Sequence, residues 1–351
     1  MGAGRQPRFP ARRGRRAHAL LEDAREQLAD ALGAHPTEVV FTSGGTEADN
    51  LAVLGGAARG ADAGRPRVAV SSVEHPAVFE AAASLGGRRT ILPVDEDGVV
   101  TPSALGALDD TMAWASLMWV NNETGTIQPI DAFVAACRRA GVRAHSDAVQ
   151  ALGHLPLAFD DSGLDALTVT AHKVGGPVGV GALVARRDAP LAPVGHGGGQ
   201  ERALRSGTVP VALALGFAAA AAEAVGRAEA ENARLEALRA RIAAGVEAIP
   251  GTRLNGGAEV GPAITHVTFD GVRADDLLLL LDAAGIDAST GSACTAGVHR
   301  PSEVLLAMGR TEAQASASLR FSLGWTSTDA DVDALLAALP DAVARARAAS
   351  A

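Results

Sequence analysis

The sequence almost lacks lysine and has no tyrosine at all. Its 351 residues include 31 basic side chains, of which only Lys173 is a lysine. Arginine supplies charge and carboxylate pairing, but its guanidinium stays protonated and cannot attack a carbonyl. A chain that keeps a single lysine therefore indicates a use for a primary amine. An ordinary surface lysine is the alternative.

Cysteine, net positive charge and long apolar runs are also scarce, and each shortage excludes a class of protein. Cys137 and Cys294 cannot form a disulfide framework, and neither has the spacing of a metal site. The net charge of −9 argues against nucleic acid, because phosphate binding needs a basic face. No apolar stretch reaches the length expected of a membrane span, and residues 1–16 lack the hydrophobic segment of a secretory signal. We predict a cytoplasmic protein without a bound metal.

Strand-like apolar runs alternate with helical patterns over most of the chain. The predicted strands of its first part are 38–42, 67–71, 89–93, 114–120, 142–145, 166–170 and 180–185, with helices at 17–32, 76–85 and 131–140 and another from Thr46. This alternation predicts a mostly parallel sheet flanked by helices. A long helical stretch at 211–248 leads to an α+β region with elements at 263–269, 274–284, 287–289, 317–323 and 329–349. We therefore predict an α/β protein with a large domain at 1–230 and a small C-terminal domain at 231–351.

Polar residues follow several predicted strands, at the edge where open α/β sheets bind their ligands. Lys173 lies between a strand and a glycine-rich turn, where a Schiff-base lysine could hold an aldehyde cofactor. Asp147 could pair with a protonated pyridine nitrogen, or it could simply cap a helix. Gln150 could bind a ring oxygen, although a surface glutamine would look the same. His75 could stack on a flat cofactor and move protons, although a lone histidine is more often structural.

Other motifs suggest anion binding. Gly45 and Thr46 open a helix after a strand, and helix N-termini bind anions, but Thr46 with Asp49 also fits a plain capping pattern. The polar, glycine-rich segment 196–208 resembles a loop near an anion. Arg320 alternates with apolar neighbours on a predicted strand, which suggests a bidentate clamp for a carboxylate. Residues 121–125, with paired asparagines before a glycine, follow another strand, but such pairs are common turn formers.

The two cysteines differ in their surroundings. Cys137 shares a helical face with Phe133 and Val134, which predicts an inert core residue. Cys294 has small residues and glycines on both sides, which predicts an accessible loop suited to a thiolate nucleophile. A loop cysteine without a role is the alternative.

Eight segments together resemble the cysteine desulfurases (NifS/IscS-like group), which are pyridoxal-phosphate enzymes of the class V aminotransferase family. They are 41–47, 120–123, 146–150, 172–173, 196–199, 205–208, 291–295 and 320–324, in the family's order, and the resemblance runs from about Ala17 to the end. It implies a fold-type I homodimer that binds pyridoxal 5'-phosphate and converts L-cysteine to L-alanine. The sulfur would pass to a scaffold or carrier protein for iron–sulfur cluster or thio-cofactor synthesis.

The resemblance also implies a role for each matching position. Lys173 would form the Schiff base with the cofactor, and Cys294 would receive the sulfur as a persulfide and contact an iron–sulfur cluster transiently. The cofactor would be bound by Gly45, Thr46, His75, Asp147, Gln150, Thr170, His172 and Thr208, the last from the other subunit of the dimer. Asn122 and Arg320 would hold the substrate carboxylate.

The sequence departs from the family pattern in two features, and alternative functions stay open. Thr170 stands where serine is usual, but it keeps the hydroxyl. The family's opening segment, with its Ala-Thr-Thr and Gly-Asn-Pro phrases, is absent, which a misplaced start codon explains better than a true truncation. A selenocysteine lyase, a small aminotransferase and an inactive truncated interaction protein are the alternative functions. Cys294 favours the desulfurase, because aminotransfer needs no such thiol.

Overall fold

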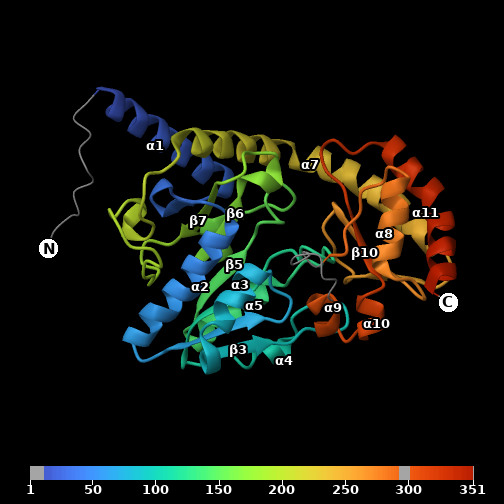
Figure 1. Cartoon of the computed structure of the whole chain (residues 1–351). Helices are drawn as coiled ribbons and strands as arrows, with labels where there is room; N and C mark the ends of the chain where they lie inside the picture. Colours follow the sequence, from blue (N-terminus) through green and yellow to red (C-terminus); the bar gives the residue numbers. More distant parts are fainter. Residues whose placement is uncertain (1–11, 292–300, 351) are drawn as a thin grey trace. The chain divides into compact units, whose positions relative to one another are not determined.

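The computed structural model describes residues 12–291 and 301–350 (Figure 1). The chain divides into two compact units. The first comprises Met1–Leu92, Leu105–Trp119 and Ile130–Arg227, and the second comprises Pro93–Ala104, Val120–Pro129 and Ala228–Ala351. Two early segments thus belong with the C-terminal part, which the sequence did not indicate. The predicted domains 1–230 and 231–351 remain a proposal, because compact units need not be the units that fold independently.

The first unit contains a seven-stranded sheet. Its strands are β1 (Val39–Thr42), β2 (Arg67–Ser71), β3 (Arg89–Leu92), β4 (Met112–Ser116), β5 (Arg143–Asp147), β6 (Ala166–Thr170) and β7 (Gly181–Ala185), in the order β1-β7-β6-β5-β4-β2-β3. Strand β7 runs antiparallel to both neighbours, and the other pairs are parallel. The predicted mostly parallel sheet is therefore confirmed. Strands β1, β2, β4, β5 and β6 all end at one edge.

Helices and short 3-10 turns complete this unit. They are α1 (Arg12–Leu32), η1 (Pro36–Glu38), α2 (Gly45–Asp62), α3 (Pro76–Ala83), η2 (Gly86–Arg88), α5 (Ile130–Ala140), α6 (Phe159–Ser162), η3 (Ala171–Val174) and η4 (Glu201–Ala203), while α4 (Pro102–Leu105) joins the two units in sequence. Helix α2 packs closely on β4, because a Cβ at Gly56 would lie 2.8 Å from the Trp114 ring. This close packing fixes the start of α2 at the edge where the parallel strands end.

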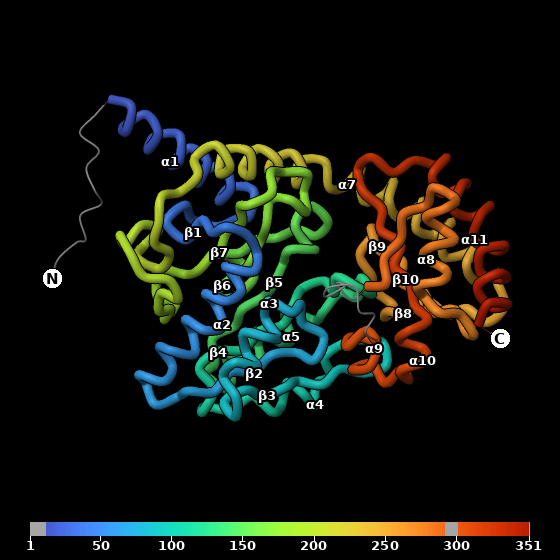
Figure 2. Tube along the Cα trace, viewed as in Figure 1, coloured from blue at the N-terminus to red at the C-terminus, as the bar shows by residue number. Residues whose placement is uncertain are grey.

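The second unit has a smaller antiparallel sheet. Its strands are β8 (Thr252–Asn255), β9 (Ile264–Phe269) and β10 (Ser318–Ser322), in the order β10-β9-β8, and its helices are α8 (Ala274–Ala283), α9 (Glu303–Ala307), α10 (Glu312–Ala315) and α11 (Asp329–Ser350). Helices α8 and α11 lie side by side, as Figure 2 shows, and bury Leu277 and Leu339 in one core with Phe269 of β9. The predicted strand 287–289 is reduced to a single bridge from Ser289 to Arg320.

Helix α7 (Val211–Glu247) contributes residues to both units. By length and composition it could cross a membrane, since its most apolar window has a mean hydropathy of 1.5 and is 22% buried. The prediction that no apolar stretch reaches this length is therefore wrong, because the alanine-rich helix is more apolar than its small side chains suggested. A core helix passes the same test. Phe217 lies in the interior of the first unit, and Leu238 and Ile242 lie in that of the second.

Candidate active site

The single lysine lies at the carboxyl edge of the first unit's sheet. All five residues of β6 are buried, and the next turn, η3, brings Lys173 to an exposed position. Gly175 ends this turn in the left-handed conformation, with φ of 78°, which favours glycine. The sequence thus builds a buried strand, a tight turn and an exposed primary amine in that order.

A buried carboxylate ends the neighbouring strand β5. Asp147 is 5% exposed, and its Oδ1 accepts a hydrogen bond of 2.9 Å from the N–H of Val149. Burial raises the pKa of Asp147 to about 6, although the Val149 N–H and the charge of Lys173 oppose this rise. The helix-cap alternative is wrong, because β5 is followed by a turn and the next helix of the described chain is α6, at Phe159. At neutral pH the side chain is mostly ionised and lies within the field of the lysine.

A second buried carboxylate, Asp49 of α2, lies beside the first. One ligand atom from each of Asp49, His75 and Asp147 lies within 4.8 Å of the other two. Such a spacing can hold a metal ion, but the charge of Lys173 acts on both His75 and Asp147 and would repel a cation. We therefore treat these three side chains as part of an organic cofactor site, and the absence of a bound metal stays a prediction.

His75 also has a structural role, because it is the N-cap residue of α3. Its Nδ1 accepts a hydrogen bond of 3.1 Å from the N–H of Ala77, so the neutral ring carries its hydrogen on Nε2. Burial, helped by the nearby Lys173 charge, lowers the pKa of His75. The preceding Glu74 is buried and accepts hydrogen bonds from the Ser71 hydroxyl and the Met118 N–H. Burial raises the pKa of Glu74 to about 8.

The start of α2 offers an anion site. The helix begins at Gly45. Its N-cap residue is Gly44, which has no side chain to accept a hydrogen bond from the N–H groups of the first turn. Thr46 is exposed in that turn, and Asp49 is buried, so the predicted Thr46–Asp49 capping pattern is wrong. The N-terminus of an eighteen-residue helix attracts an anion through its dipole and N–H groups.

The other predicted phosphate ligands lie in the same unit. The Thr170 hydroxyl lies 3.1 Å from Nδ1 of His172 and also donates to the Val180 carbonyl. His172 is exposed in part of its ring only: partial burial, helped by the charge of Lys173, lowers its pKa. Gln150 is half-buried three residues after Asp147. Thr208 is exposed in the segment that follows η4.

The two predicted ligands of the substrate carboxylate meet in the second unit. Arg320 of β10 donates a hydrogen bond of 2.7 Å from Nη1 to the Asn122 carbonyl. Among residues 12–291 and 301–350, its Nε has no hydrogen-bond partner. Burial lowers the pKa of Arg320, and the charge of Glu123 opposes this effect. The guanidinium therefore keeps a donor that a carboxylate could accept.

Only one of the two cysteines lies among the described residues. Cys294 lies outside the described residues, so its role stays a prediction. Cys137 is 1% exposed in α5, and burial raises the pKa of its thiol far above the ordinary value. It is a core residue, as its sequence surroundings predicted.

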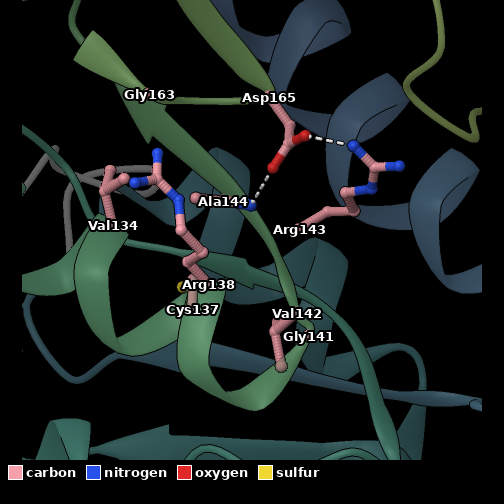
Figure 3. Close-up of a pocket in the computed structure, with 9 residues that line it drawn as sticks. All are labelled: Val134, Cys137, Arg138, Gly141, Val142, Arg143, Ala144, Gly163 and Asp165. Carbon is pink, nitrogen blue, oxygen red and sulfur yellow. Dashed lines mark hydrogen bonds and ion pairs between the residues drawn. The ribbon is translucent and has the colours of Figure 1, made fainter.

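A separate pocket of about 380 Å³ opens beside Cys137 (Figure 3). Its lining residues are Val134, Cys137, Arg138, Gly141, Val142, Arg143, Ala144, Gly163 and Asp165, so it includes none of the described site residues. Two of the lining residues, Arg143 and Asp165, form an ion pair of 2.6 Å.

Sequence reasoning missed the role of Asp49 as a buried neighbour of Asp147. The capping pattern drew attention to Thr46 instead. The signal that could have found it is its place among Ala48, Leu51 and Ala52, which form the buried face of α2. A carboxylate on such a face is rarely found without a partner or a function.

The chain is similar to known proteins over most of its length. A family model described as aminotransferase class-V matches residues 4–335. An "IscS-like cysteine desulfurase" of Mycobacterium tuberculosis is 53% identical, with 95% of this chain and 88% of the relative covered. A "Cysteine desulfurase IscS" of Methanosarcina thermophila is 41% identical, with 95% and 84% covered. Among solved structures, a "NifS-like protein" matches with a TM-score of 0.88 and 32% identity, covering 97% of this chain and 91% of the other. "SspA in complex with cysteine" matches with a TM-score of 0.76 and 32% identity, covering 91% and 90%.

Proposed function

The chain belongs to the class-V aminotransferase family, and on this premise we propose that it is a cysteine desulfurase whose cofactor binds beside Lys173. The observation that carries this proposal is the single lysine, exposed at the sheet edge within the field of a buried carboxylate. The enzyme converts L-cysteine and a thiol of its own to L-alanine and a persulfide. This reaction forms one sulfur–sulfur bond and breaks the carbon–sulfur bond of the substrate.

The described side chains fit pyridoxal 5'-phosphate. Lys173 offers an amine for the aldehyde, and Asp147 offers a buried carboxylate for the pyridine nitrogen. The start of α2 with Gly45 and Thr46 offers donors for the phosphate, and Thr170 and His172 are proposed as further phosphate ligands. The N-cap residue of α2, Gly44, makes no side-chain hydrogen bond to the first turn of the helix. This supports the fit, because a bound anion would accept hydrogen bonds from the N–H groups that a capping side chain usually satisfies. Gln150 and Thr208 are proposed ligands on the strength of the family pattern alone.

When bound, the cofactor withdraws electrons from the amino acid joined to its aldehyde. Lys173 would hold the cofactor through its amine, and the same amine could take a proton from the substrate Cα. The charge of Asp147 would keep a proton on the pyridine nitrogen. His75 presents an N–H at Nε2, because Ala77 occupies Nδ1. Asn122 and Arg320 are proposed to hold the substrate carboxylate.

Cys294 is proposed as the thiol that attacks the sulfur of the substrate. Its sulfur forms the new sulfur–sulfur bond, and the electrons of the broken carbon–sulfur bond stay with the carbon that becomes the alanine methyl group. We further propose a cytoplasmic homodimer, in which Thr208 reaches the phosphate of the other subunit, and transfer of the sulfur to a scaffold or carrier protein. The mass of the protein in solution, measured by light scattering, tests the dimer.

Three variants, compared with the wild-type protein, test the activity. Wild-type protein mixed with pyridoxal 5'-phosphate should turn yellow and should release alanine and sulfide from L-cysteine with a reductant. Lys173→Ala should lose the visible band. A colourless wild-type protein would refute the cofactor assignment.

Cys294→Ser should keep the colour and lose sulfide release, whereas Cys137→Ser is the matched control, because it removes the buried thiol of α5. Undiminished sulfide release by Cys294→Ser would contradict the proposed thiol. Transamination products in place of alanine would favour the aminotransferase alternative.

A further inference from the structure

Behind the proposed cofactor site, Asp49 lies in a buried cluster that the mechanism above does not use. Its side chain is 1% exposed, and one of its oxygens accepts a hydrogen bond from the Thr168 hydroxyl of β6. The other oxygen, Oδ1, has no hydrogen-bond partner within the described chain. A buried carboxylate oxygen without a partner is costly if it is charged. It therefore needs a physical explanation.

A chain of hydrogen bonds leads to Asp49 from the interior of the sheet. The Ser116 hydroxyl of β4 lies 2.9 Å from Nδ1 of His145, and Nε2 of His145 lies 3.0 Å from the Thr168 hydroxyl. Burial lowers the pKa of His145 to about 3, so its ring is neutral and donates from one nitrogen only. Thr168 donates to Asp49, so it accepts from Nε2 of His145, and Nδ1 accepts from Ser116. The donors all run toward Asp49.

The groups that face Asp49 bring little positive charge. From β5 come Asp147 and the neutral His145, with Nε2 of His145 3.8 Å from Oδ1 of Asp49. The segment after β2 adds the buried Glu74 and the imidazole of His75.

Lys173 acts on Asp147 and on His75 rather than on Asp49. Two carboxylates so close together in a buried site cannot both be ionised at little cost. The one that faces the lysine loses its proton first. Burial, the charge of Asp147 and, more weakly, that of Glu74 raise the pKa of Asp49 well above the ordinary value.

We propose that Asp49 is a positioning residue that stays protonated behind Asp147 and leaves Asp147 as the single ionised carboxylate facing the cofactor. Its unpaired Oδ1 is then the hydroxyl of a carboxylic acid, and its other oxygen accepts from Thr168. The neutral acid supports Asp147 sterically without competing with it for the pyridinium proton. This role rests on the proposed function, because it concerns the site of the same cofactor.

The protonation of Asp49 can be tested on the protein without cofactor. An unfolded aspartate is ionised near pH 6, so a folded Asp49 that is protonated releases its proton on unfolding. Asp49→Asn should therefore lower the number of protons released by about one, read from the slope of the unfolding free energy against pH. Asp62→Asn is the matched control in the same helix, because its side chain is 73% exposed and water solvates it in both states. An unchanged slope in Asp49→Asn would overturn the proposal.

The positioning role is tested on the holoenzyme with pyridoxal 5'-phosphate itself. Asp49→Ala leaves Thr168 without its acceptor and should weaken cofactor binding on the order of tenfold. Asp49→Asn keeps an acceptor oxygen and places an N–H donor where the acid has its hydroxyl, so it should restore most of this loss. Binding by Asp49→Asn that is as weak as in Asp49→Ala would also overturn the proposal.

The two proposals fail separately. A wild-type protein that stays colourless with the cofactor would refute the proposed function, while the proton count without cofactor would still decide whether Asp49 is protonated. If Asp49→Ala does not fold, Asp49→Asn still tests the proposal through its proton count and its affinity for the cofactor. Loss of cofactor binding in Asp49→Asn would count against the proposal.

Discussion

A buried ion pair joins the first helix to the turn before Thr208, and removing it should be costly. Glu201 of η4 accepts hydrogen bonds of 2.7 and 2.9 Å from the Arg25 guanidinium of α1, and it also accepts from the Phe41 N–H of β1. The side chains of Glu201 and Arg25 are 4% and 11% exposed. Glu201, Arg202 and Ala203 all have positive φ, at 42°, 60° and 60°. The pair therefore holds a turn that L-residues adopt only at a cost.

Glu201→Ala tests this pair. The substitution leaves the Phe41 N–H without its acceptor. It leaves the buried Arg25 guanidinium with only the Val39 carbonyl, at 2.7 Å, and the carboxylate of Glu22, at 3.4 Å. Breaking a buried ion pair from one side costs about 3–5 kcal/mol of unfolding free energy. If about one of the three left-handed residues relaxes, the strain released returns roughly 1 kcal/mol of that sum. We therefore expect a net loss of about 2–4 kcal/mol, with the turn only partly relaxed.

Urea unfolding followed by circular dichroism measures the loss. Glu223→Ala is the matched control, because Glu223 forms an exposed pair with Arg227 in which both side chains are more than half exposed. Such a pair contributes less than about 1 kcal/mol. A double variant, with leucine at both Arg25 and Glu201, should regain stability over Glu201→Ala, because no buried charge remains unpaired. A loss for Glu201→Ala no larger than that of the control would refute the reasoning.

Three further changes have definite expected outcomes. Gly56→Ala places a Cβ 2.8 Å from the Trp114 ring, so it should cost about 1–3 kcal/mol and change the tryptophan fluorescence; an unchanged unfolding midpoint would contradict the packing of α2. Because burial raises the folded pKa of Glu74 to about 8 from an ordinary 4.5, its contribution to stability is complete below pH 4.5 and is lost as pH rises through 8. Glu74→Gln should therefore make the unfolding free energy fall less steeply over this range, by about 1.4 kcal/mol per pH unit, and an identical slope would show that Glu74 is ionised in the fold. Arg320→Lys should raise the KM for L-cysteine about tenfold and change kcat less, because lysine cannot form a bidentate pair with a carboxylate; an unchanged KM would remove Arg320 from the substrate site.

The sheet and its polar edge could be predicted because both depend on local sequence. Strand β6 is a short apolar run. Asp147, which ends β5, and Lys173, which follows β6, reach the edge by chain connectivity alone. The short helices α9 and α10, of 5 and 4 residues, are too brief to show a helical period. Strand β8 was missed because its sequence, Thr-Arg-Leu-Asn, contains one apolar residue and shows no apolar run.

Other features depend on tertiary packing and could not be predicted locally. The segments 93–104 and 120–129 belong to the second unit although the chain places them within the first. Asp49 looked like a capping residue, since its burial depends on which face of α2 meets the sheet. The ion pair between Arg25 and Glu201 joins residues 176 positions apart.

The exposed position of Lys173 in η3 has a consequence for chemical modification. In this sequence every reagent or enzyme that acylates a lysine side chain has a single target. Most proteins carry many surface lysines that take up such modification without harm, but here one acetyl group on a side-chain amine would remove the proposed cofactor anchor. The mass gained on acylation of side-chain amines therefore counts blocked active sites directly, and protection from acylation measures how much of the protein has its cofactor bound.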